Sequence, residues 1–362
     1  MSDPAAALDA RILAAIAAYA LDDDAFLALA VDLFAYQIAN NRPYAAFARS
    51  LGFDADRLPQ SLEEIPAAPA AAFKEQRLAT FPPQQCVLWF QTSGTTQGTG
   101  GRHEFDSPAL YEAALLASFD RMMLADGQRL RYLLLVPDPR HHPHSSLGFM
   151  MDVVAEWRGD GEHGWYVSDD ALALEPFLDD VQRACSEDRP VCLATTAFAL
   201  VALLDALASA SSTLSLPRGS RIMETGGFKG RSRIVQRDDL YREAAHRLGV
   251  PISMIVAEYG MTELSSQYYD ALESRSVTEP RVKRAPPWLR SLVVDDQGRP
   301  VPDGIVGSIR HIDLANRGSV IAVDTEDLGA AVAGGLVLLG REPGAELRGC
   351  SLDAETLLRR RG

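Results

Sequence analysis

The feature that most constrains the fold is a regular alternation of short apolar runs and amphipathic stretches in the middle of the chain. Runs with strand propensity lie at residues 133–136, 191–195, 221–225 and 252–256. Apolar residues at helical spacing lie between them, at residues 171–184, 198–208 and 239–248. Apolar strands that alternate with amphipathic helices indicate a layered α/β fold with a largely parallel sheet.

The pattern changes on both sides of this region. Residues 5–50 predict helices, and a strand at 86–90 and a helix at 107–123 are expected after them. Beyond residue 285, short strands separated by Gly, Pro and Asp turns are expected at 292–294, 307–312, 320–324 and 336–339. We therefore predict an α/β core with a helical N-terminus at 1–285, a small β-rich subdomain at 286–340, and a short C-terminal segment at 341–362 that carries Cys350.

Composition excludes several classes of function. The chain has 35 Lys and Arg against 49 Asp and Glu, a net charge of −14, which argues against general nucleic-acid binding because phosphate contacts need clustered cations. No apolar run approaches the roughly 20 residues that cross a bilayer, and the early acidic residues are unlike a secretory signal. The four cysteines form no CxxC pair, so we expect no disulfide scaffold and a cytoplasmic location.

The strongest single motif is QTSGTTQGTGG at residues 91–101, directly after the strand expected at 86–90. A loop dense in Ser, Thr and Gly after a strand presents backbone N–H groups and hydroxyls that suit phosphates. It is not the GxxxxGK[ST] loop of P-loop NTPases, since no Lys-Ser or Lys-Thr follows. An ordinary surface loop would have the same composition, and this alternative stays open.

Other motifs follow later strands. Residues 224–230 (ETGGFKG) place Gly226 and Gly227 where bare backbone lets a planar ring lie close, although a tight turn has the same sequence. Residues 258–263 (EYGMTE) place an aromatic ring, a hydroxyl and a carboxylate at the C-terminal end of a strand, where ligand sites of α/β proteins cluster. Residues 324–329 (DTEDLG) are expected to end a strand with carboxylates that suit ribose hydroxyls, and a solvated turn is the alternative.

In this order and spacing, the motifs resemble those of the adenylate-forming superfamily, which includes acyl-CoA synthetases, adenylation domains and luciferases. The resemblance implies the N-terminal-type domain of that fold, with mixed sheets. It also implies that ATP, with Mg²⁺, activates a carboxylic acid to an acyl-adenylate and pyrophosphate.

A narrower resemblance, to the LuxE-type acyl-protein synthetases, covers about residues 30–355. Its segments are FAYQ at 34–37, NRPY at 41–44, Pro66, Pro69, FK at 73–74, SSL at 145–147, ETGGFKG at 224–230, YGMTEL at 259–264 with Gln267, and TEDLG at 325–329. This resemblance implies that a fatty acid is activated and its acyl group passed to a cysteine near the C-terminus. It also implies that the C-terminal lid domain of the superfamily is largely absent.

The superfamily resemblance implies a role for each motif residue. Phosphate contacts would come from Thr92, Ser93, Gly94, Thr95 and Thr96. Adenine contacts would come from Gly226, Gly227 and Tyr259, and Gly260 and Thr262, in the motif of Tyr259, would also belong to the nucleotide site. Glu263 would hold Mg²⁺, which prefers oxygen ligands, Asp327 would bind ribose, and Arg341 would lie near the hinge. Gln97 and Arg102 depart from the glycine and lysine that many relatives have.

Cys350 is the candidate acyl carrier. A neighbouring cation, Arg348, and a helix expected to start near Asp353 both favour its thiolate. A small packing residue is the alternative for this position. The other cysteines, Cys86, Cys185 and Cys192, lie in apolar contexts and are expected in the core.

Two further side chains are candidate catalytic residues. His144 stands about where the superfamily often has a histidine or aromatic residue beside the acyl site, as the resemblance implies. Lys229, with Arg231, could offset phosphate charge, and surface charges are the alternative. The sequence HHPH at 141–144 lacks a second ligand cluster, so zinc is not expected.

The sequence therefore predicts an ATP-dependent acid–thiol ligase of the acyl-protein synthetase type. A ligase that charges CoA or an acyl-carrier protein is one alternative, and a non-catalytic nucleotide-binding subunit is another. The expected substrate is a carboxylic acid, in particular a fatty acid. An acyl reductase or a carrier protein is the expected class of partner, and neither nucleic acid nor a membrane span is expected.

Overall fold

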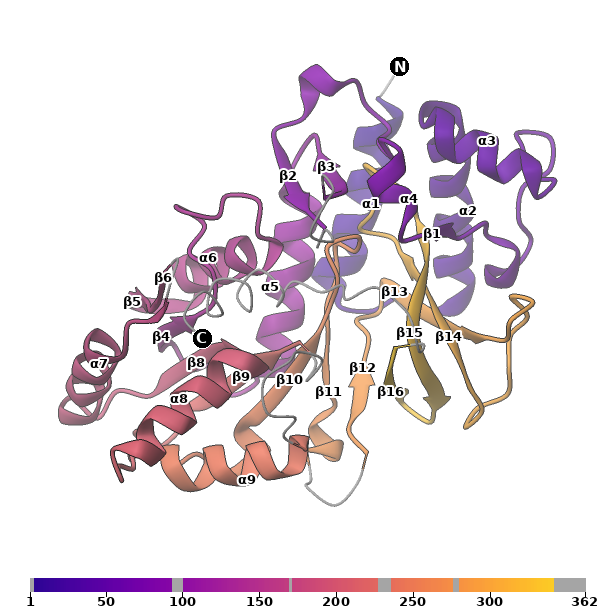
Figure 1. Cartoon of the computed structure of the whole chain (residues 1–362). Helices are drawn as coiled ribbons and strands as arrows, with labels where there is room; N and C mark the ends of the chain where they lie inside the picture. Colours follow the sequence, from indigo (N-terminus) through magenta and orange to yellow (C-terminus); the bar gives the residue numbers. More distant parts are fainter. Residues whose placement is uncertain (1–2, 93–99, 169–170, 227–235, 276–279, 342–362) are drawn as a thin grey trace. The chain divides into compact units, whose positions relative to one another are not determined.

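The computed structural model describes residues 3–92, 100–168, 171–226, 236–275 and 280–341 of the 362-residue chain (Figure 1). The chain folds into two compact units. Unit 1 contains the described residues of Met1–Ser118, Met261–Tyr268 and Val282–Glu346, and unit 2 contains those of Phe119–Gly260 and Tyr269–Arg281. Each unit is thus built from segments that are far apart in the sequence.

Unit 2 contains a parallel sheet whose central strands are buried. Its order is β10-β9-β8-β4-β5, and each neighbouring pair is parallel. The strands are β4 (Leu130–Leu135), β5 (Gly159–Trp165), β8 (Val191–Thr196), β9 (Arg221–Thr225) and β10 (Ile255–Tyr259). Every residue of β4, β8 and β9 is buried, which explains the apolar runs of β4 and β8.

Helices cover this sheet and form the core of unit 2. They are α6 (Ser146–Arg158), α7 (Leu174–Ser186), α8 (Ala197–Ser209) and α9 (Arg237–Leu248), and Figure 1 shows α8 and α9 in front of β8, β9 and β10. Apolar side chains of α7, α8 and α9 pack with strand residues such as Leu133, Leu193 and Ile222. This packing confirms the predicted α/β layers. The short elements are β6 (Val167–Ser168), β7 (Ala171–Leu172), η3 (Ile252–Met254), β11 (Tyr268–Asp270) and η4 (Leu272–Ser274).

Unit 1 contains an antiparallel sheet in the order β13-β14-β15-β16-β12. Its strands are β12 (Val282–Arg284), β13 (Leu289–Val294), β14 (Val306–Asp313), β15 (Ala322–Val332) and β16 (Gly335–Arg341). The short strand β1 (Ala68–Pro69) pairs in parallel with β15, and a separate hairpin joins β2 (Leu88–Gln91) to β3 (Arg102–Phe105). The short strands expected after residue 285 are therefore present.

The N-terminal helices of unit 1 share a core with this sheet. The helices of the unit's first segment are α1 (Pro4–Ala18), α2 (Asp23–Asn40), α3 (Arg42–Ser50), α4 (Ala72–Glu75) and the start of α5 (Ala109–Met123), with turns η1 (Leu62–Glu64) and η2 (Pro83–Gln85). Asn41 caps α3 by accepting a hydrogen bond from the Tyr44 amide. The buried amide of Gln37 on α2 bonds the Asn316 carbonyl and the Ile321 N–H. Residues 286–340 thus pack with the N-terminal helices, and the boundaries at 285 and 340 stay a prediction.

Four local predictions are wrong. Residues 171–172, expected to begin a helix, form the strand β7, and α7 begins at Leu174. Residues 252–254 form a 3₁₀ turn, because a proline precedes them, and the strand begins only at Ile255. The stretch 324–329 lies inside β15 rather than at its end, because β14 and β16 pair with β15 on both sides of it. Cys185 is exposed on α7, because the neighbouring Ala184 takes the buried position.

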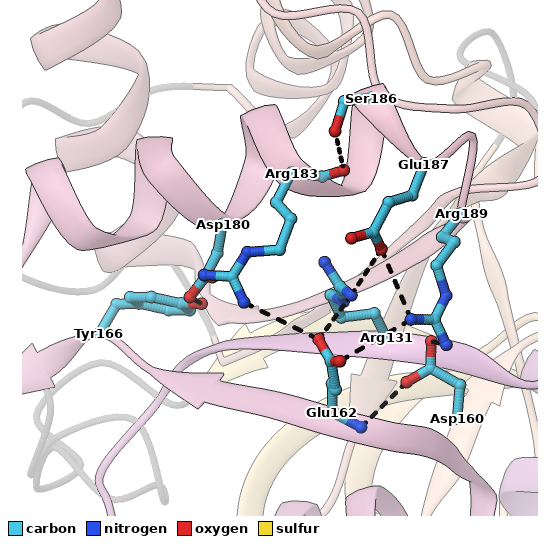
Figure 2. Close-up of polar contacts among 9 residues, drawn as sticks. All are labelled: Arg131, Asp160, Glu162, Tyr166, Asp180, Arg183, Ser186, Glu187 and Arg189. Atoms are coloured by element: carbon cyan, nitrogen blue, oxygen red, sulfur yellow. Dashed lines mark hydrogen bonds and ion pairs between the residues drawn. The ribbon is translucent and has the colours of Figure 1, made fainter.

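A set of charged side chains links β4, β5 and α7 near the amino ends of the parallel strands (Figure 2). The ion-pair cluster consists of Arg131, Asp160, Glu162, Asp180, Arg183, Glu187 and Arg189. The side chain of Arg131 is 3% exposed, and its Nη2 lies 2.5 Å from a carboxylate oxygen of Glu162 and 2.9 Å from one of Glu187. These contacts neutralise a charge that β4 carries into the buried sheet.

Candidate functional site

The described ends of the Ser/Thr/Gly-rich loop are fixed at its base. Thr92, directly after β2, is 1% exposed, and its amide donates a 2.8 Å hydrogen bond to the Gly101 carbonyl. Its hydroxyl is buried and has no hydrogen-bond partner among the described residues. An unsatisfied buried hydroxyl costs about 1–3 kcal/mol, so a ligand oxygen at this point would remove that cost.

Two glycines at the same base leave no room for a side chain. A Cβ on Gly100 would lie 2.6 Å from the carbonyl oxygen of Thr92, and a Cβ on Gly101 would lie 2.5 Å from that of Phe73. Both neighbours are backbone atoms, which cannot rotate away as a side chain can. Glycine is therefore required at Gly100 by the close approach of the two loop ends, and at Gly101 by the close packing against α4.

Thr262 and Glu263 are held through their backbone carbonyls in unit 1. They are 5% and 4% exposed. The imidazole Nδ1 of His103, on β3, lies 2.8 Å from the carbonyl oxygen of Thr262, and Asn316 Nδ2 donates a 2.9 Å hydrogen bond to the carbonyl of Glu263. Buried side chains thus fix the backbone that carries the predicted Mg²⁺ ligand.

Asp313 fixes the residues that follow this pair. It is fully buried and accepts hydrogen bonds from the Ser265 amide at 2.9 Å and the Ser266 hydroxyl at 2.8 Å. Burial raises the pKa of the Asp313 carboxyl to about 6, against the hydrogen bonds that lower it. The indole N–H of Trp288 donates to the same Ser266 hydroxyl at 3.0 Å, so the segment rests on a connected set of buried polar groups.

Asp327 and Arg341 stand directly opposite each other on β15 and β16. Asp327 is 9% exposed, and its amide donates to the Thr325 hydroxyl at 3.2 Å. Asp324, in the same motif, is engaged by Arg310, whose Nε lies 2.7 Å from its carboxylate. The backbones of Asp327, the predicted ribose ligand, and Arg341, the predicted hinge residue, are therefore paired across the two strands. The carboxylate of Asp324 is used in an ion pair.

In unit 2 the predicted residues lie at the carboxyl ends of adjacent strands. Gly226 follows β9 with a φ of 96°, a conformation that favours glycine. Tyr259 is the last residue of β10, and Gly260 follows it. The hydroxyl of Thr225 donates a short hydrogen bond to the Glu258 carboxylate, which ties these two strand ends together. Ligands of α/β proteins bind at such strand ends.

His144 lies half-buried at the start of α6. The next residue, Ser145, caps this helix by accepting the Gly148 amide at 3.1 Å. A few residues before His144, Asp138 forms an ion pair with Arg140, and Nη2 of Arg140 lies 2.6 Å from the Asp138 carboxylate. Burial raises the pKa of Asp138, but the hydrogen bonds and charge of Arg140 outweigh burial and hold the pKa below its usual value.

The described part of the chain contains no group of three or more His, Cys, Asp or Glu that could hold a metal ion. In the same residues, no helix combines the length and the apolar character needed to cross a membrane. Cys192 is buried in β8, where burial raises the pKa of its thiol to about 12, as expected of a core cysteine. Cys86 is half-buried.

Several predicted site residues lie outside the described residues. They are Ser93, Gly94, Thr95, Thr96, Gly227, Lys229 and Cys350, together with the side chain of Arg341. Their roles stay predictions.

Sequence reasoning does not identify the residues that support this site. His103 and Asn316 bond the Thr262–Glu263 segment from sequence separations of 159 and 53 residues, and neither belongs to a motif. Glu258 stands in a motif, but nothing in the sequence indicates its bond to Thr225. The one usable signal is for His103, a lone polar ring on the strand that follows the loop.

The predicted ligands in unit 1 carry oxygen atoms of the types that ATP and Mg²⁺ bind. Thr92 offers a buried hydroxyl that no described residue bonds. Glu263 offers a carboxylate, and Mg²⁺ in nucleotide sites is held by one or two carboxylates together with substrate phosphates. Asp327 offers oxygen acceptors for ribose hydroxyls.

One curated protein is similar in sequence to this chain. It is the long-chain-fatty-acid–luciferin-component ligase of Aliivibrio fischeri, which is 23% identical over 282 residues, 74% of this chain and 70% of that protein. No family model matches the chain. The similarity confirms the predicted resemblance to the LuxE-type synthetases.

Solved structures share the fold. A 2-hydroxyisobutyryl-CoA ligase matches with a TM-score of 0.65 over 88% of this chain and 68% of its own, at 16% identity. ATP-bound MatB from Rhodopseudomonas palustris (0.52, 18% identity) covers 71% of this chain, and the amide bond synthetase McbA from Marinactinospora thermotolerans (0.51, 20%) covers 72%. The chain spans only 48% of that MatB chain and 49% of that McbA chain. These matches confirm the predicted adenylate-forming α/β fold with mixed sheets.

Proposed function

We propose that this protein is an ATP-dependent ligase that activates a carboxylic acid as an acyl-adenylate and passes the acyl group to a cysteine thiol. The similarity to the Aliivibrio fischeri ligase supports a fatty acid as the substrate. The observation that carries the proposal is the buried Thr92 hydroxyl, which no described residue bonds, at the base of a loop whose composition suits phosphates.

In the first step, a carboxylate oxygen attacks the α-phosphorus of ATP, an O–P bond forms, and pyrophosphate leaves. The Thr92 hydroxyl donates to a phosphate oxygen, and Asp327 accepts from ribose hydroxyls. Glu263 would hold Mg²⁺, which when bound supplies positive charge that offsets the charge of the phosphates. These contacts orient the nucleotide and stabilise the charge that develops during attack.

In the second step, a thiolate attacks the acyl carbon of the adenylate. The C–S bond forms, the C–O bond to AMP breaks, and the thiol proton passes to solvent. Cys350 is the proposed acceptor because the charge of Arg348 beside it favours the thiolate. A ligase that charges CoA or a carrier protein would share the first step and differ only in the thiol.

Carboxylate-dependent ATP–pyrophosphate exchange with a panel of acids tests the first step. Thr92→Val keeps the shape of the side chain and removes the hydroxyl, so we expect exchange to fall about 100-fold. Thr80→Val is the matched control, because the Thr80 hydroxyl is also buried without a described partner, outside the loop. Exchange should be unchanged in this control, and equal losses in the two variants would contradict the role of Thr92.

The acceptor is tested by labelling the protein with a radioactive fatty acid and ATP. We expect a label that hydroxylamine removes and that Cys350→Ser abolishes. A label that persists in Cys350→Ser excludes this cysteine, and efficient product formation with CoA or a carrier protein supports that alternative. Tight ATP binding without exchange would indicate the non-catalytic subunit.

A further inference from the structure

His103 lies on β3, the strand that follows the Ser/Thr/Gly-rich loop, and is 1% exposed. Two apolar rings pack against its imidazole ring. The centroid of the imidazole lies 4.3 Å from that of the Phe105 ring and 5.6 Å from that of the Phe73 ring, and the Phe73 pair is edge-on. Phe73 belongs to the FK segment of α4. The ring therefore has little freedom to move independently of the loop base and α4.

The hydrogen bond of His103 defines its protonation state. Nδ1 lies 2.8 Å from the Thr262 carbonyl oxygen, and since a carbonyl can only accept, Nδ1 carries a proton. Burial lowers the pKa of His103 to about 4, although the bond to Thr262 opposes this shift. At neutral pH the ring is thus uncharged, with its proton on the nitrogen that faces Thr262.

We propose that His103 is a positioning residue for the adenylation step: by donating to the Thr262 carbonyl, it sets the Thr262–Glu263 pair at a fixed distance from the base of the phosphate loop. This proposal rests on the function proposed above. It assigns a role to a residue that belongs to none of the sequence motifs. His103 acts through the backbone and is not placed in contact with substrate.

Contacts on both sides of His103 support this role. On the loop side, Thr92 bonds Gly101, and a Cβ on Gly101 would collide with the Phe73 backbone, so loop base and α4 form one packed group. On the carboxylate side, the Glu263 carbonyl is already held by Asn316, from the loop after β14. His103 supplies the bond from the loop side to the same segment. Misplacement of a reacting or binding group by about 1 Å can lower a rate about 100-fold.

Two substitutions of His103 separate the contribution of its hydrogen-bond donor from that of its aromatic ring. His103→Phe keeps an aromatic ring between Phe73 and Phe105 but has no donor for the Thr262 carbonyl. His103→Asn loses the ring, but its side-chain amide offers a donor close to the place of Nδ1. We expect His103→Phe to lower the kcat of pyrophosphate exchange about 10- to 100-fold, with the KM for ATP changed less than about threefold. We expect His103→Asn to retain kcat within about fivefold of the wild type, although it packs less well.

Ser319→Ala is the matched control. The Ser319 hydroxyl is buried in unit 1 and donates a 2.8 Å bond to the Leu78 carbonyl, so the substitution removes a side-chain bond of the same length to a backbone carbonyl and leaves the bonds to Thr262 and Glu263 in place. Melting temperatures are measured for all variants, and exchange is assayed well below them. We expect Ser319→Ala to lose stability and to retain its kcat within about twofold.

The outcomes distinguish the two proposals. A wild-type chain that exchanges pyrophosphate, with His103→Phe impaired in kcat and His103→Asn rescued, supports the positioning role. Wild-type exchange with His103→Phe as active as the wild type, or with both His103 variants impaired only in proportion to their lost stability, overturns the role of His103 alone. If the wild-type chain shows no pyrophosphate exchange with any acid of the panel, the proposed function is overturned and, with it, this role.

Discussion

The two ends of the parallel strands in unit 2 carry polar residues of different character. At the amino ends, the ion-pair cluster matches each charge with an opposite one, as in Arg131 with Glu162 and Arg189 with Asp160 at 2.8 Å (Figure 2). At the carboxyl ends, hydroxyls and a glycine are prominent, and carboxylates are held by local partners: Glu258 accepts from Thr225, and Asp138, after β4, pairs with Arg140. Charges that satisfy one another stabilise a fold, whereas hydroxyls and bare backbone at strand ends suit a ligand.

The largest expected effect comes from substituting alanine for a glycine with positive φ at each end of the parallel sheet of unit 2. Gly226, after β9, and Gly161, in β5, have φ values of 96° and 102°. Alanine at either position should cost about 1–3 kcal/mol of unfolding free energy, because a side chain disfavours this conformation. Only Gly226→Ala should also lower pyrophosphate exchange, about 100-fold, since close approach to the nucleotide needs bare backbone there.

Gly161→Ala is a clean control because a Cβ at this position meets nothing within 4 Å. Urea unfolding and exchange assays on the two variants give both quantities. A similar loss of exchange in Gly161→Ala would break the distinction between the two ends.

The second-largest expected effect is a loss of unfolding free energy with no loss of exchange. Arg131→Met removes the central cation of the ion-pair cluster, whose side chain is 3% exposed, while Glu162 and Glu187 are 51% and 40% exposed. Water can solvate the carboxylates that remain, so we expect a loss of about 1–3 kcal/mol in urea unfolding, with exchange per folded molecule unchanged. Arg11→Met, which breaks an exposed pair with Asp32, should cost less than about 0.5 kcal/mol. Loss of exchange in Arg131→Met would show that the amino ends also serve the reaction.

The smallest expected effect depends on pH. Hydrogen bonds from Arg221, at the amino end of β9, hold the pKa of Asp126 below its usual value. Because the folded pKa is the lower one, this pair contributes stability above about pH 4 and loses it as the pH falls through the folded pKa. Asp126→Asn should therefore lower the unfolding free energy by less than about 1 kcal/mol at pH 7, and the difference should shrink in acid. An equal difference at pH 7 and pH 3 would contradict this origin.

Elements with a strong local pattern are predictable from the sequence. The strand at 221–225 forms as predicted, and helices are present within residues 5–50 as expected, with α2 beginning at Asp23 because Asp22 caps it. The strand β5 is missed, because its sequence GDGEHGW has neither alternation nor β-branched residues. It forms because β4 offers a parallel partner, and pairing of this kind between distant segments leaves no local signal.

The residues of the candidate site likewise fall into those that the sequence predicts and those that it does not. Motif residues such as Thr92, Tyr259 and Glu263 are found because their residue types and order are distinctive. His103 and Asn316 are not found, because their roles come from contacts across 159 and 53 residues of sequence. The position of Asp327 inside β15 is likewise set by pairing with β14 and β16, which the local sequence does not specify.

The most direct test of the central claim is ATP–pyrophosphate exchange by the full chain across a panel of carboxylic acids that includes long-chain fatty acids. We expect exchange that requires the acid, is strongest with fatty acids, and falls about 100-fold in Thr92→Val but not in Thr80→Val. Absence of acid-dependent exchange across the whole panel, by a chain that is folded and binds ATP, would contradict the central claim.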